Sequence, residues 1–68
     1  SYLVDMIEED GIGDASPWVD AALAARIEEA ADDVGEERLR PIFERLEGAA
    51  AFWQIKVALA CRRARGEG

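Results

Sequence analysis

The feature that most constrains the fold is an apolar run from Ala49 to Cys61, which only Gln54 and Lys56 interrupt. A helix that spans a membrane needs about 20 consecutive apolar residues, so this run is too short and no membrane segment is expected. Alanine and leucine favour helix, and the sustained alternation of apolar and polar residues that is typical of half-buried strands is absent from the chain. The run therefore predicts a buried helix in an all-α protein.

Apolar side chains occupy two faces of this helix. One stripe continues a pattern that begins upstream, at about 100° per residue, and its members are Leu39, Ile42, Phe43, Leu46, Trp53, Val57, Ala60 and Ala64. A second stripe, which has no upstream counterpart, consists of Phe52, Ile55 and Leu59. A helix with two apolar faces needs two neighbours. The second stripe is therefore covered either by the first helix of the chain or by another protein chain.

The chain is expected to form a single domain, residues 1–68, of three helices. The first helix is short, covers residues 2–10 and ends at the two glycines that follow. Ser16 is a typical N-terminal cap, and Pro17 is a typical first helical residue because its missing N–H is not needed there. This pair predicts an amphipathic second helix from Pro17 to about Val34.

The third helix is expected to be long and to run from about Pro41 to the C-terminal end. Proline and glycine both weaken a helix interior, so a kink is expected near Pro41 or Gly48. The main apolar stripe keeps its helical phase across Gly48, and this favours one continuous helix over two separate ones.

The net charge of −7 is unevenly distributed. Residues 1–38 carry twelve acidic and two basic side chains, whereas residues 39–68 carry three acidic and six basic ones. An acidic domain repels phosphate, so nucleic acid is not expected as a partner. The basic residues Arg62, Arg63 and Arg65 lie where positive charge complements the helix dipole; the alternative is a nucleic-acid-binding arm.

The composition does not favour an enzyme. The chain has no histidine and no threonine, and it has only two serines, which excludes histidine-based acid–base chemistry and catalytic triads. Cys61 is the only cysteine and is interpreted as a small core residue because no histidine is present to activate it. We expect no enzymatic activity, no cofactor and no metal. A lone cysteine also favours a reducing, cytoplasmic location.

A short chain buries a small core and often gains support from another subunit. Trp18 lies off the apolar stripe of the second helix, and it either covers the first helix and turn or forms an exposed aromatic anchor. These features predict a small helical protein–protein interaction or oligomerisation module, with a protein partner or a second copy as a homo-oligomer. The candidate partner-binding residues are Phe52, Ile55, Leu59, Trp18 and Trp53.

Residues 10–23, DGIGDASPWVDAAL, resemble the turn and second helix of ribbon-helix-helix antitoxins. Those proteins have a glycine turn, a serine cap and an apolar helix that ends in Ala-Leu. The matching positions here are Gly11, Ala15, Ser16, Val19, Ala22 and Leu23. The resemblance implies an alternative function, that of a DNA-binding regulator or antitoxin acting through the end of the chain that carries the arginines. The DNA-reading strand of that family has no counterpart in these residues, so no DNA-binding residue is carried over.

Overall fold

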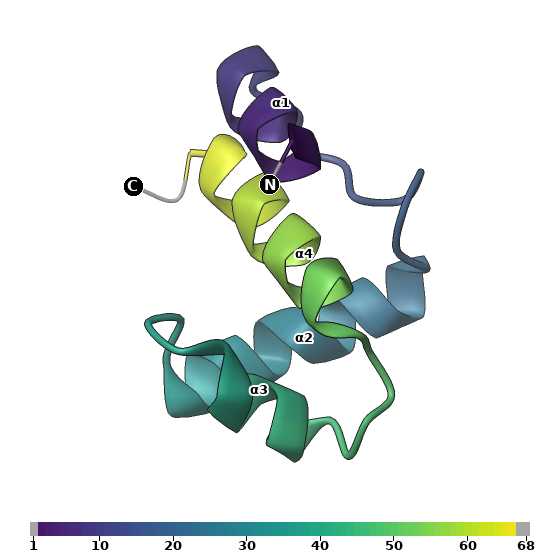
Figure 1. Cartoon of the computed structure of the whole chain (residues 1–68), viewed down its shortest axis with the longest axis vertical. Coiled ribbons are helices and arrows are strands. Elements are labelled where there is room, and N and C mark those ends of the chain that lie inside the picture. The colour runs from purple at the N-terminus through teal and green to yellow at the C-terminus, as the bar shows by residue number, and fades with distance from the viewer. Residues whose placement is uncertain (1, 67–68) are drawn as a thin grey trace.

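The computed structural model describes residues 2–66, which fold into four α-helices and contain no strand (Figure 1). The helices are α1 (Tyr2–Asp10), α2 (Ala21–Val34), α3 (Leu39–Arg45) and α4 (Phe52–Ala64). The predicted all-α class is confirmed, whereas the predicted number of three helices is wrong. None of the helices within residues 2–66 is both long enough and apolar enough to cross a membrane.

α4 is the central helix of the domain. It packs against each of the other three helices, and α1 lies beside its C-terminal half (Figure 1). Small side chains on several faces of α4 allow this close approach. Its buried residues are Ile55, Val57, Ala58, Leu59, Ala60 and Cys61. Cys61 is the small core residue that the sequence predicts, and burial raises the pKa of its thiol.

The second helix begins four residues later than predicted. The backbone N–H and the hydroxyl of Ser16 both donate to the Asp14 carboxylate, each at 3.0 Å, and these bonds hold the pKa of Asp14 below its ordinary value. Ser16 is thus occupied in a turn that precedes α2. The cap of α2 is Asp20, whose carboxylate accepts the N–H of Ala22 at 3.0 Å. The predicted C-terminal end is confirmed, because Gly35 follows the helix with a φ of 95°.

The long third helix is also wrong, because the chain breaks between α3 and α4. Glu47 and Gly48 adopt φ values of 56° and 80°, a left-handed conformation that a continuous helix does not permit. Leu46 and Ala50, on either side of the break, are both buried in the core at 3% and 1% exposure, whereas Trp53, the next member of the predicted stripe, is 51% exposed. Pro41 causes no kink, since it lies in the first turn of α3, where a missing N–H costs nothing.

Candidate nucleic-acid interface

α3, the turn at residues 46–51 and α4 form a compact unit of two packed helices. The rings of Phe43 and Phe52 stack at its centre, with a centroid separation of 4.4 Å and an interplanar angle of 12°. Gln54 helps to start α4, because its side-chain oxygen accepts the N–H of Ala51 at 2.9 Å, which is half of a capping box. The turn is therefore tied to the start of the second helix.

The first two turns of α4 carry the exposed surface of this unit. Trp53 is 51% exposed and Phe52 is 39% exposed, and Lys56 is also exposed. Side chains three and four residues apart are neighbours on a helix, so Lys56 lies next to both aromatic residues. We call these three residues, Phe52, Trp53 and Lys56, the α4 patch.

Few basic side chains are available to an external anion. Within residues 2–66, three of them form no ion pair, namely Arg26, Arg38 and Lys56. Arg40 pairs with Glu44 at 3.8 Å across the exposed surface of α3, and such a pair contributes only about 0.2–0.5 kcal/mol. Arg38, Arg40 and Lys56 therefore remain free or weakly engaged on the α3–α4 unit or immediately before it.

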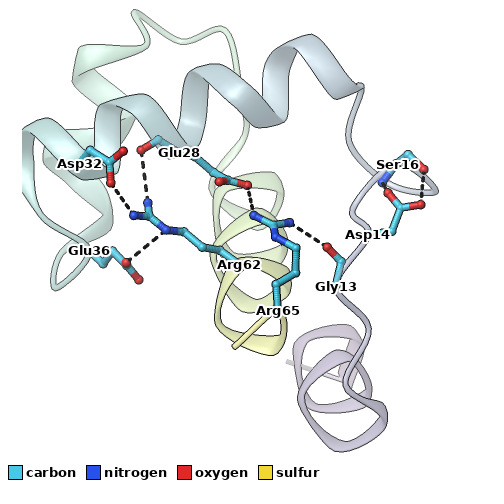
Figure 2. Close-up of polar contacts among 8 residues, drawn as sticks. All are labelled: Gly13, Asp14, Ser16, Glu28, Asp32, Glu36, Arg62 and Arg65. Carbon is cyan, nitrogen blue, oxygen red and sulfur yellow. Dashed lines mark hydrogen bonds and ion pairs between the residues drawn. The ribbon is translucent and has the colours of Figure 1, made fainter. Parts of the chain in front are cut away.

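Arg62, by contrast, is engaged inside the domain (Figure 2). Its guanidinium donates to the Glu28 backbone carbonyl at 3.3 Å, pairs with the carboxylate of Asp32 and lies 3.7 Å from that of Glu36. Hydrogen bonding to Asp32 raises the pKa of Arg62. With only 18% of its side chain exposed, Arg62 links the last turns of α4 to α2 and to the turn after it.

The other two C-terminal arginines are also held by the domain. Arg63 pairs with Glu8 of α1 at 3.4 Å. Arg65 donates to the carbonyl of Gly13 at 2.8 Å and pairs with Glu28 at 2.6 Å (Figure 2). The alternative of a nucleic-acid-binding arm at this end is therefore not supported, because its cations pair with acidic groups of α1, of α2 and of the turn after α2.

Replacing Arg62 by methionine is expected to lower the free energy of unfolding by about 1–2 kcal/mol, because partly exposed charge-assisted contacts are lost while the alkyl stem stays packed. Urea unfolding followed by circular dichroism measures this. Arg26→Met is the matched control, since Arg26 forms no ion pair within the described part of the chain, and it should leave stability unchanged. A loss of DNA affinity in Arg62→Met without a loss of stability would contradict the structural role.

Some of the candidate partner-binding residues are buried in the structure and others are exposed. Ile55 and Leu59 are 0% and 2% exposed, because the helices of this chain cover them. Two of the three residues of the second apolar stripe therefore belong to the internal core. Phe52 and Trp53 remain exposed, and Trp18 is partly buried against the core. Lys56 is not among the residues predicted for an interface, although it is the one cation beside two aromatic side chains in the apolar run.

A family model described as a helix-turn-helix domain matches residues 1–59. Comparison with curated proteins and with solved structures found no match. The family match covers α1, α2, α3, the turn and the first half of α4. The α4 patch thus lies within the matched region, whereas the three C-terminal arginines lie outside it.

This match corrects the function predicted from the sequence. A helix-turn-helix family points to DNA binding, so a protein–protein interaction or oligomerisation module, and the expectation that nucleic acid is not a partner, are both wrong. The DNA-binding alternative is the better supported one, and its support comes from the helix-turn-helix family and not from the ribbon-helix-helix family that residues 10–23 resemble. With 59 of its 68 residues matched, the chain belongs to the helix-turn-helix domain family.

Proposed function

We propose that this domain binds DNA through the α3–turn–α4 unit, with the first two turns of α4 as the contacting element. The family match over residues 1–59 carries the proposal. In helix-turn-helix proteins the N-terminal residues of the second helix reach the bases, while the first helix crosses the backbone. Here the N-terminal turns of α4 carry the exposed side chains of Phe52, Trp53 and Lys56.

The cations of the unit support this assignment of roles. Lys56 on α4 and Arg38 before α3 form no ion pair within residues 2–66, and Arg40 is released by breaking one exposed pair. We assign all three to DNA phosphates. Acidic side chains elsewhere limit the affinity, because a net charge of −7 repels the polyanion beyond the immediate contacts.

The domain is proposed to be a binding module without catalytic activity, since the α4 patch offers two aromatic rings and an ammonium group and no nucleophile or general base. A cytoplasmic location fits a DNA-binding role and is part of the same proposal. The expected homo-oligomer stays a prediction, which light scattering of the free chain and of its DNA complex would check.

The affinity for DNA is expected to depend only modestly on salt. With at most three phosphate contacts, the slope of log K against log salt for duplex DNA should be no steeper than about −3. Fluorescence anisotropy of a labelled short duplex, titrated with the protein at several low salt concentrations, measures both binding and slope. The absence of binding to any form of DNA at the lowest salt would overturn the proposal. A slope near twice this value would show that the C-terminal arginines also leave their internal partners.

A further inference from the structure

We infer that the α4 patch binds an unpaired DNA base, with the indole of Trp53 stacked on the base and Lys56 at the adjacent phosphate. The inference rests on the proposed DNA-binding function and specifies which form of DNA the domain prefers, namely DNA with a single-stranded segment. Four observations carry it: the chemistry of the patch, the support behind it, the access to α4 and the charge of the domain.

The chemistry of the patch suits stacking better than the reading of paired bases. Base edges in the major groove are read mainly by hydrogen-bonding side chains such as arginine, lysine, asparagine and glutamine. In the first two turns of α4, Lys56 is the exposed charged donor, and the side-chain oxygen of Gln54 is occupied by the N–H of Ala51. The larger part of the patch is aromatic, and aromatic rings bind bases whose faces are free.

The two aromatic side chains differ in what supports them. The ring of Phe52 stacks on Phe43 at 4.4 Å, so one of its faces is already covered. Trp53 is the more exposed ring, at 51% against 39%, and it projects from a helix whose following turns are buried in the core. A rigid helix that presents an indole to solvent needs little reordering to receive a base.

Access to α4 is limited to one end. α1 lies beside the C-terminal half of the helix (Figure 1), and Glu8 of α1 borders Ala60 and pairs with Arg63 there. A helix covered in this way cannot lie along a major groove over its full length. Its N-terminal end can still meet a strand end, a gap or a single-stranded segment.

The charge of the domain also favours a single strand over a duplex. Duplex DNA carries one negative charge per about 1.7 Å, and a single strand has a lower charge density, as its shallower salt dependence shows. A domain with a net charge of −7 is therefore repelled less by a single strand than by a duplex. Stacking on Trp53 contributes affinity without any further cation. Lys56 supplies the positive charge that pairs with the neighbouring phosphate.

Three labelled DNAs test the inference by anisotropy at low salt: a single strand, a blunt duplex and a duplex with a single-stranded overhang. The single strand and the overhang should bind about 5- to 150-fold more tightly than the blunt duplex, the equivalent of one stacked base. Trp53→Ala should abolish this preference, because the single strand and the overhang lose the stacked base whereas the blunt duplex has none to lose. Circular dichroism checks that the variant is folded, which is expected because half of this side chain is already exposed.

Trp18→Phe is the matched control, because it removes the other tryptophan, leaves the α4 patch intact and makes Trp53 the sole tryptophan whose emission reports on binding. Its preference should equal that of the original chain, and its emission should be quenched by the single strand. Blunt duplex binding as tight as single-strand binding, with no quenching, would overturn the inference and leave the proposed function standing. A failure of all three DNAs to bind would instead overturn the proposed function.

Discussion

Replacing Ile55 by alanine is expected to lower the free energy of unfolding by about 2–5 kcal/mol, the usual cost of truncating a buried isoleucine. Ile55 is 0% exposed and lies near the start of α4, the helix that packs against all the others. At about 0.05–0.15 kcal/mol per residue, a domain of 68 residues has a total stability of about 3–10 kcal/mol. The substitution therefore removes a large share of that stability, which urea unfolding monitored by circular dichroism measures.

Val34→Ala is the control for this substitution. Val34 is 41% exposed at the end of α2, so the same kind of aliphatic truncation there should change stability by no more than about 0.5 kcal/mol. If Ile55→Ala were as mild as Val34→Ala, Ile55 would not be a core residue, and the packing of the other helices around the start of α4 would be wrong.

The sequence predicts the helix ends well where a single residue decides them. α1 spans Tyr2–Asp10 as expected, because the glycines that follow favour a turn over further helix. Gly35 ends α2 because its φ of 95° suits glycine alone. At both helix ends no other nearby residue could end the helix instead, so the local sequence is sufficient to predict where the helix stops.

Local signals fail where two residues compete. Ser16 and Pro17 form a typical helix start, but Asp14 captures the Ser16 side chain and Asp20 provides a second cap. The sequence does not show whether Ser16 or Asp20 caps the helix, since each of them can accept a backbone N–H at a helix start. The break at Gly48 is missed for a different reason: the turn buries Leu46 and Ala50, so the hydrophobic pattern continues although the helix does not.

The candidate interface depends on pairings that link distant parts of the chain. The positions of the C-terminal arginines at a helix end can be predicted, whereas their partners cannot, because Asp32 precedes Arg62 by 30 residues and Glu8 precedes Arg63 by 55. The acidic first half was expected to repel nucleic acid as a whole. Part of that acidity instead forms ion pairs with the arginines of α4, whereas Lys56 forms no ion pair within residues 2–66.

Reversing the charge of Lys56 is therefore expected to have the largest effect on DNA binding. Lys56→Glu removes one phosphate contact and adds a repulsive charge beside the same phosphate. The affinity for single-stranded DNA should fall at least about tenfold at low salt, and the slope of log K against log salt should become shallower by about 1 to 2. Anisotropy titrations at several salt concentrations measure both quantities.

Arg26→Glu separates this local contact from the overall charge. Arg26 is exposed on α2 and forms no ion pair within residues 2–66, so the substitution changes the net charge by the same amount as Lys56→Glu. If DNA recognition is centred on the α4 patch, Arg26→Glu weakens binding much less and leaves the slope nearly unchanged. An equal loss of DNA affinity in the two variants would mean that binding depends only on the net charge of the domain. Lys56 would then have no specific role in the interface.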